Sequence, residues 1–264
     1  MDASTVERPG RHSLRTWSAT LLFWPYLLLS SGVLFAFALV IFACTVPFDR
    51  RRAVLHLYTC AWAYHYVKLL PLWTARFEGL EHIQPGRTYV LAANHQSLGD
   101  ILVLFGLFKH YKWVSKRAIF RVPFIGWNMS LNDYVALLRG DPASIETMMQ
   151  ACRRHLQRGS SVMMFPEGTR SVDGEIKPFK HGAFTLASEL NLELVPIVID
   201  GTRDALPKHG IMLEQRWGLP IRVRVLAPVA PQPGESGIEL SERVRSRMIA
   251  ELDAMRGRVG SSTS

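Results

Sequence analysis

The chain has 264 residues and a hydrophobic fraction of 48%, which is ample for one catalytic domain with an appended segment. Lysine and arginine number 31 against 22 aspartates and glutamates, and the formal net charge of +9 suits an anionic partner, either nucleic acid or a membrane surface. The three cysteines, Cys44, Cys60 and Cys152, are far apart, odd in number and outside any CxxC pair, which argues against a disulfide framework or a zinc ribbon.

The first predicted element is a long hydrophobic segment. Residues 16–48 contain no charged side chain, and the run is longer than the about 20 apolar residues that cross a bilayer once. It is too long for a cleavable signal peptide, and no small-residue cleavage site closes it. Pro25 and Ser30-Ser31-Gly32 interrupt the run, so two arrangements stay open: one tilted span, or two short helical arms that dip into one leaflet.

Arginines flank this segment on both sides, so the positive-inside rule mildly favours cytoplasmic placement of both ends. Residues 53–73 then mix Tyr and Trp with His and Lys. This mixture is typical of a helix at the headgroup level, which we expect here, although an ordinary core helix remains the alternative. Residues 1–75 together form the predicted N-terminal membrane-anchoring helical segment. The flanking arginines are Arg8, Arg11, Arg15, Arg50, Arg51 and Arg52.

Nucleic acid is the less favoured anionic partner. The sequence contains no zinc-finger spacing, no basic-region heptads and no RNA-binding aromatic signature. We therefore expect anionic membrane lipids as a partner and no nucleic acid.

After residue 75 the pattern changes to short apolar runs that alternate with helical stretches. Near-continuous apolar strands separated by helices predict an α/β fold with a largely parallel or mixed sheet flanked by helices. We assign residues 76–259 to one catalytic domain and the small, polar residues 260–264 to a disordered tail. The predicted strands are residues 89–93, 113–115, 162–165, 195–199 and 221–226, and the predicted helices are residues 100–108, 144–157, 183–190 and 241–255.

In such sheets, ligands bind beyond the carboxyl ends of the strands, and His95 directly follows the first predicted strand. Asp100, in the first turn of the next helix, can accept a hydrogen bond from Nδ1 of His95, which would fix the tautomer and leave Nε2 free as a base. No GxSxG elbow or activated cysteine supplies a protein nucleophile, so the pair suits an enzyme that activates a hydroxyl of its substrate. By spacing alone, a capped helix start with a structural histidine is the commoner explanation. One His and one Asp are too few ligands for a metal site.

A second group of residues follows the predicted strand at 162–165. Gly168 in a tight turn lets a ligand approach the backbone, and Arg170 offers a planar fork that matches phosphate oxygens. Glu167 can orient Arg170 or contact a substrate hydroxyl. A structural turn with a surface Arg–Glu pair stays open as the alternative.

Further basic residues fall near the ends of other strands. Lys116, Arg117 and Arg139 are each, taken alone, a solvated surface charge, but together with Arg170 they can form one anion pocket. The apolar residues 122–127 contain Pro and Gly. They either line an acyl or acceptor channel or form a buried loop.

These pieces occur together and in order, and in combination they resemble the glycerolipid acyltransferase family that includes 1-acyl-glycerol-3-phosphate acyltransferases. The resemblance covers about residues 77–208. It rests on Asn94-His95-Gln96-Ser97 through Asp100, then Lys116, residues 122–126, residues 165–170 and residues 195–197.

The resemblance implies a role for each site residue. It makes His95 the general base and Asp100 its partner. It places Arg170 on the phosphate of the acceptor, although the sequence before Arg139 matches the family only loosely. The substrate-binding residues that it implies are Glu167, Gly168, Thr169, Arg170, Lys116 and Arg139.

The resemblance also implies the reaction. A fatty acyl group moves from acyl-CoA or acyl-acyl carrier protein to the free hydroxyl of 1-acyl-glycerol-3-phosphate, giving phosphatidic acid in phospholipid biosynthesis. The partners are then a lysophospholipid acceptor and an acyl thioester donor, and no metal or cofactor is expected. We expect the protein at the cell membrane with its active site on the cytoplasmic face, where such donors occur.

Three alternatives remain open. The acceptor can be another lysophospholipid or glycerol-3-phosphate. The enzyme can be a membrane lipid or thioester hydrolase that uses water in place of the acceptor. A lipid-binding scaffold without catalysis is the third alternative, and the intact His95 and Asp100 argue against it.

Overall fold

The computed structural model describes residues 14–69, 73–205 and 218–258. Within these ranges seven strands form one sheet in the order β1-β7-β6-β2-β5-β3-β4, and every neighbouring pair is parallel except β6 and β7. The predicted α/β fold with a mixed sheet is confirmed. The strands are β1 (Trp73–Glu78), β2 (Val90–Ala93), β3 (Tyr111–Lys116), β4 (Val135–Leu137), β5 (Ser161–Met164), β6 (Leu194–Asp200) and β7 (Leu219–Val225).

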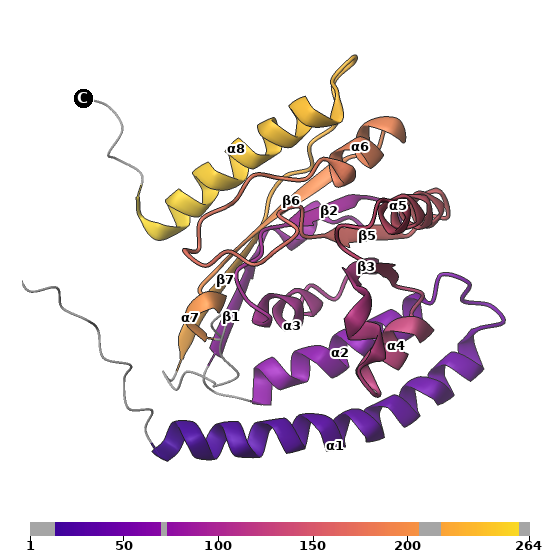
Figure 1. Cartoon of the computed structure of the whole chain (residues 1–264), viewed down its shortest axis with the longest axis vertical. Helices are drawn as coiled ribbons and strands as arrows, with labels where there is room; N and C mark the ends of the chain where they lie inside the picture. The colour runs from indigo at the N-terminus through magenta and orange to yellow at the C-terminus, as the bar shows by residue number, and fades with distance from the viewer. Residues whose placement is uncertain (1–13, 70–72, 206–217, 259–264) are drawn as a thin grey trace, which may run out of the picture.

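Helices cover both faces of the sheet (Figure 1). α5, α6 and α8 lie on one face, α2 and α3 lie on the other, and α1 packs outside α2 as the outermost layer. The helices are α1 (Leu14–Thr45), α2 (Ala53–Leu69), α3 (Gly99–Phe105), α4 (Ile125–Leu131), α5 (Pro142–Gln157), α6 (Gly182–Glu189), α7 (Thr202–Ala205) and α8 (Gly237–Arg256), with short 3-10 helices η1 (Leu80–His82) and η2 (Arg117–Arg121).

Successive residues of the central strand β2 point to opposite faces of the sheet and so join two hydrophobic clusters. Leu91 and Ala93 belong to the cluster beneath α2 and α3, whereas Val90 and Ala92 belong to the cluster beneath α5, α6 and α8. All four side chains are fully buried, as expected for a strand covered on both faces. The end of β2, where the predicted catalytic loop begins, therefore stands on a rigid support.

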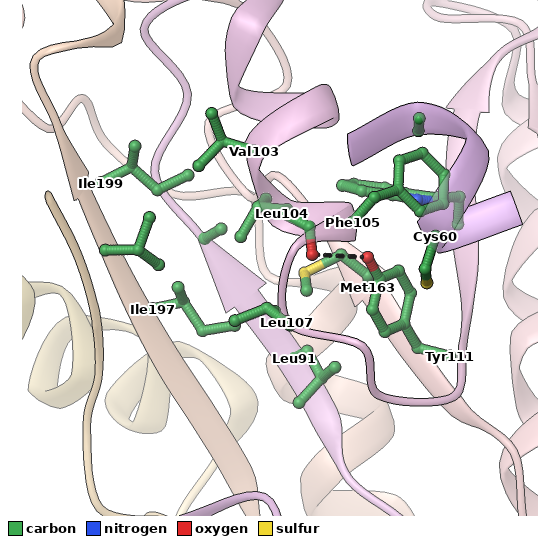
Figure 2. Packing of buried hydrophobic residues seen from close by; sticks show 14 of the residues in the cluster. Cys60, Leu91, Val103, Leu104, Phe105, Leu107, Tyr111, Met163, Ile197 and Ile199 are labelled. Atoms are coloured by element: carbon green, nitrogen blue, oxygen red, sulfur yellow. Dashed lines mark hydrogen bonds between the residues drawn. The ribbon is translucent and has the colours of Figure 1, made fainter. Parts of the chain in front are cut away.

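Figure 2 shows the cluster on the α2–α3 side. Aliphatic side chains of β2, β5 and β6 meet those of α3 there, and the buried Tyr111 hydroxyl donates a hydrogen bond of 3.0 Å to the carbonyl oxygen of Leu104. Because this bond satisfies the last turn of α3, it fixes that helix against the sheet.

α1 runs as a single helix through Pro25 and through residues 30–32. The Ser30 hydroxyl donates to the carbonyl oxygen of Tyr26 at 2.6 Å, one turn back, which keeps that side chain on the helix. The break required for two short arms is therefore absent, and that alternative is wrong.

α2 is a core helix, so the expected headgroup-level helix is wrong. It lies between α1 and α3, and its aromatic and basic side chains make internal contacts. Nε2 of His56 donates to the carbonyl oxygen of Lys109 at 2.9 Å, and the Tyr134 hydroxyl donates to Nδ1 at 2.6 Å. Burial is the main cause that lowers the pKa of His56 well below its usual value, which keeps the ring neutral. Composition could not separate the two cases, because both use amphipathic aromatics.

The connection between α1 and α2 is tied to the catalytic domain. Lys112 is 1% exposed, and its ammonium group donates to the carbonyl oxygens of Arg51 at 2.8 Å and Asn132 at 2.6 Å. Burial lowers the pKa of Lys112 to about 8. Arg52 donates to the carbonyl oxygen of Leu131 at 2.6 Å. Two of the arginines counted as flanking charges thus take part in this connection, and the helix pair is held rigidly on the sheet.

The predicted boundary between residues 75 and 76 falls inside β1, which pairs with β7. The N-terminal helices also share one hydrophobic cluster with the sheet, so they form part of the same folded unit. The sequence patterns missed β1, β4, α4 and α7, which are short or lack clear periodicity. Residues 260–264 lie outside the described residues.

Candidate active site

The predicted site residues gather along one edge of the sheet. β2, β5, β3 and β4 are neighbours in that order and parallel, so their carboxyl ends lie at the same edge. His95 follows β2, the turn at residues 165–170 follows β5, Lys116 ends β3, and Arg139 follows β4. Residues scattered over the sequence thus face a common region, as the rule for parallel sheets predicts.

His95 and Asp100 form a direct pair. Nδ1 of His95 donates to Oδ2 of Asp100 at 2.8 Å, which leaves Nε2 as the lone-pair nitrogen. The side chain of His95 is 8% exposed, and that of Asp100 is fully buried. Among the described residues, none forms a hydrogen bond with Nε2 of His95, so this atom is open to a substrate.

The carboxylate of Asp100 is held by three further donors. Oδ2 also accepts the backbone N–H groups of Gln96 at 2.6 Å and Ser97 at 2.9 Å. Oδ1 accepts the hydroxyl of Thr202, which follows β6. Backbone N–H groups and a hydroxyl thus replace the water that a buried carboxylate loses, and they hold Asp100 in one orientation.

The aromatic ring of Phe165 fixes the other side of the imidazole. The two rings stack with centroids 4.0 Å apart and planes 12° from parallel, and Trp113 packs behind Phe165 at 5.4 Å. The imidazole therefore has its plane set by Phe165 and its rotation set by Asp100.

Glu167 supports the loop that carries His95 through hydrogen bonds to two backbone N–H groups. Its Oε1 accepts the backbone N–H of His95 at 2.8 Å, and its Oε2 accepts that of Lys177 at 3.2 Å. The residue is 5% exposed, and burial raises the pKa of Glu167 to about 7, although the two N–H groups oppose this rise. These contacts give Glu167 a supporting task that the sequence did not indicate. Its contact with the acceptor stays a prediction.

The turn after β5 is joined to His95 at a second point. The backbone N–H of Ser171 donates to the carbonyl oxygen of His95 at 2.7 Å. Gly168 has φ of 67°, and a Cβ there would lie 2.9 Å from Cε of Lys180. The left-handed conformation by itself accounts for this glycine, and its contact with the acceptor stays a prediction. Thr169 is exposed and Arg170 is half-buried, so both sit at the surface of the site.

The remaining predicted cations lie farther along the same edge. Lys116 is exposed at the end of β3, two strands from β2. Arg139 is exposed beyond β4, three strands from β2, which is about 14 Å at the usual strand spacing. Lys116 is therefore the better placed of the two to assist Arg170.

Sequence reasoning named Asn94 and Gln96 only as motif residues without a structural role, and it missed Thr202 altogether; all three polar side chains shape the loop. The side-chain amide of Asn94 exchanges two hydrogen bonds with the backbone of Ile199, at 2.7 and 2.9 Å, and Gln96 donates to the same carbonyl oxygen at 3.1 Å. One signal was present, because Thr202 follows a strand that we had predicted. Over the part of the chain that the structure describes, no group of three His, Cys, Asp or Glu side chains is placed to hold a metal ion.

Comparison with known proteins places these features in a family. A family model described as acyltransferase matches residues 74–200. The chain is 35% identical over 231 residues to a chloroplastic 1-acyl-sn-glycerol-3-phosphate acyltransferase of Arabidopsis thaliana, covering 84% of this chain and 62% of that protein. A 1-acyl-sn-glycerol-3-phosphate acyltransferase of Chlamydomonas reinhardtii is 34% identical, with 88% of this chain and 69% of that protein covered. The chain thus spans less than two thirds of the Arabidopsis protein.

A bacterial protein and a solved structure match over nearly their whole length. A 1-acyl-sn-glycerol-3-phosphate acyltransferase of Pseudomonas aeruginosa is 29% identical, covering 91% of this chain and 93% of that protein. The crystal structure of the 1-acyl-sn-glycerophosphate acyltransferase of Thermotoga maritima superimposes with a TM-score of 0.74 at 23% identity, covering 93% of this chain and 99% of that chain. The latter likeness establishes the shared fold.

The two backbone contacts of Glu167 predict a kinetic effect. Glu167→Gln keeps the shape but turns an NH2 group toward the N–H of His95 or Lys177. We expect kcat to fall about tenfold or more with the acceptor KM nearly unchanged, measured by steady-state kinetics. The exposed Glu189→Gln serves as the control. An increase in acceptor KM at unchanged kcat would show that Glu167 binds the acceptor instead.

The raised pKa of Glu167 predicts a pH-dependent stability. The folded pKa of about 7 lies above the reference value of 4.5, so between these values the folded state binds more protons and the free energy of unfolding falls as pH rises. Relative to Glu167→Gln, the wild type should lose on the order of 2–3 kcal/mol across this window, measured by denaturant unfolding. A difference that stays constant or grows with pH would contradict the assignment.

Proposed function

This chain belongs to the glycerolipid acyltransferase family, and on that premise we propose that it transfers a fatty acyl group from acyl-CoA or acyl-acyl carrier protein to the free hydroxyl of 1-acyl-glycerol-3-phosphate. The product is phosphatidic acid. The observation that carries the proposal is the His95–Asp100 pair with Nε2 open at the edge of the sheet. The relatives' names supply the substrate class.

The proposed chemistry starts with a neutral His95. Nε2 takes the proton of the acceptor hydroxyl as its oxygen attacks the thioester carbonyl carbon. The imidazolium that forms is stabilised by Asp100, which bonds to the opposite nitrogen. When the tetrahedral intermediate collapses, the C–S bond breaks and His95 returns its proton to the departing thiolate. The enzyme thus ends in its starting state.

Cysteine environments support the substrate hydroxyl as the nucleophile. Cys60 and Cys152 are both buried, and burial raises the pKa of each thiol, to about 12 for Cys152. A thiolate is the reactive form of cysteine, so neither residue is suited to form an acyl-enzyme. Direct transfer between the two bound substrates fits this environment better.

The acceptor phosphate is the second part of the proposal. Arg170 lies in the turn whose next residue, Ser171, bonds to the backbone of His95, so a phosphate held there stays close to the base. A guanidinium binds phosphate oxygens in a bidentate way, and the exposed Lys116 can add a second charge. Thr169 and Arg139 are assigned supporting contacts on the same grounds.

The chain associates with membranes, and we assign that task to α1. Within Leu21–Thr45, only 11% of an apolar stretch of 18 residues is buried. Leu22, Leu29 and Val40 are each more than half exposed. Their spacing of 7 and 11 residues puts them on one outward face. Anionic lipid can in addition bind the exposed Arg50 beyond the helix.

Contacts of the inner face of α1 support one way for the helix to meet the bilayer. The carbonyl oxygen of Leu34 accepts the Tyr58 hydroxyl of α2 at 2.8 Å, and Phe35 packs against Trp127 of α4 at 5.6 Å. A helix covered by the folded domain along this face cannot also be surrounded by lipid. We therefore favour insertion of its outer face into one leaflet, the cytoplasmic one, where acyl thioesters occur.

Product analysis tests the proposed reaction. Purified full-length protein with labelled acyl-CoA or acyl-acyl carrier protein should convert 1-acyl-glycerol-3-phosphate to phosphatidic acid faster than it acylates other lysophospholipids or glycerol-3-phosphate. His95→Ala should reduce the rate at least about 100-fold, because the base is lost, while the exposed His181→Ala should not. Thioester cleavage that proceeds equally without a lysolipid would identify a hydrolase and refute the proposal.

Vesicle binding tests the assignment of α1. Leu22→Gln combined with Leu29→Gln should move the protein from the membrane pellet to the supernatant in sedimentation with anionic phospholipid vesicles. Its melting temperature should stay the same, since both side chains are exposed. Ile145→Gln with Ile238→Gln, exposed apolar residues of α5 and α8, is the matched control. Unchanged vesicle binding of the α1 variant would contradict the assignment.

A further inference from the structure

Thr202 is a fully buried hydroxyl residue at the start of α7, just beyond β6. Its Oγ1 donates to Oδ1 of Asp100, although the two residues are 102 positions apart. Nothing in the motifs around His95 requires a hydroxyl at this place. We propose that Thr202 is a positioning residue for acyl transfer, holding the Asp100 carboxylate in the orientation that receives His95; this rests on the proposed function.

The distribution of donors around Asp100 shows why one hydroxyl matters. Oδ2 receives His95, Gln96 and Ser97, all from the loop directly before α3. Oδ1 receives Thr202, which comes from a different strand. Rotation of the carboxylate about its Cβ–Cγ bond would break the hydrogen bonds of Oδ1 and of Oδ2 together. The hydrogen bonds to the two oxygens therefore fix the plane of the carboxylate.

Asp100 has no exposed surface, so water does not reach Oδ1 to replace the hydroxyl. Without Thr202, this oxygen would keep its negative charge in a buried place without the donor that it has now. The carboxylate would then turn toward another donor. This change weakens its support for the imidazolium that forms at His95 during transfer.

The backbone brings Thr202 to Asp100 by a turn that tolerates only glycine. Gly201 has φ of 94°, and an added Cβ would lie 2.3 Å from the carbonyl oxygen of Pro220. Before this turn, the end of β6 is fixed to the His95 loop by the two bonds between Asn94 and Ile199. The position of the hydroxyl relative to Asp100 is therefore determined from both sides of the turn.

Thr202 also packs at the contact between the start of α3 and the start of α7. Cβ of Thr202 lies 4.0 Å from the position that a Cβ at Gly99 would occupy, so the two helix starts are in close contact. A residue that only filled this contact would act through its shape. The hydrogen bond to Asp100 instead assigns the function to the hydroxyl oxygen. Variants that change only the shape of the side chain or only its hydroxyl distinguish these two roles.

Two variants divide shape from hydrogen bonding. Thr202→Val keeps the branched shape and removes the hydroxyl, and Thr202→Ser keeps the hydroxyl and removes the methyl group. We expect kcat of Thr202→Val to fall about tenfold or more, with KM for acceptor and donor within about twofold of wild type. Thr202→Ser should retain most of the wild-type kcat. In the Asp100→Asn background, Thr202→Val should cause little further loss, because the partner has already been altered.

Proton NMR tests the effect of the Thr202–Asp100 hydrogen bond without relying on turnover. The low-field proton signal of Nδ1–H in His95 should be present in wild type and Thr202→Ser and should shift or disappear in Thr202→Val. A wild-type kcat and signal in Thr202→Val would overturn the proposal. Equal kcat losses in both variants, with raised KM and lower melting temperature, would also overturn it and assign Thr202 a packing role. If the wild type acylates no lysolipid, the proposed function fails. The proton signal still tests whether Thr202 positions Asp100 and His95.

Discussion

The hydrogen bonding of one buried carboxylate underlies the whole site. Asp100 accepts an imidazole N–H, two backbone N–H groups and a hydroxyl, and it has no exposed surface. These donors satisfy the carboxylate in the interior, where a polar group without hydrogen bonds would be costly. The orientation of His95, and with it the availability of Nε2, follows from this arrangement.

The sheet holds the residues of the site in fixed positions relative to one another. β2 is central, buried on both faces, and flanked by β5 and β6, so three neighbouring strand ends supply His95, Glu167 and the Thr202 turn. The cations assigned to the acceptor phosphate come from β5, β3 and β4 on one side of β2. The outer helix α1 is rigidly joined to this framework through α2 and the buried Lys112. On the proposed function, an acceptor that stays in the membrane would meet the site at a fixed distance from α1.

The sequence predicted much of the fold and the centre of the site, and the failures have physical causes. Buried strands such as β5 and β6 are near-continuous apolar runs, and His95 with Asp100 lies within one short segment, so local patterns sufficed. β4 has only three residues, which is too few for any periodicity. α2 was placed at the headgroups because its aromatic residues serve equally well in a core. The contacts of Glu167 and Thr202 join segments 72 and 102 residues apart, and no local motif contains them.

A structure of the protein with 1-acyl-glycerol-3-phosphate bound tests the central claim most directly. The account predicts the free hydroxyl oxygen of the acceptor about 2.6–3.2 Å from Nε2 of His95, with the phosphate against the guanidinium of Arg170. A hydroxyl turned away from the imidazole, with the phosphate held at another edge of the sheet, would contradict it.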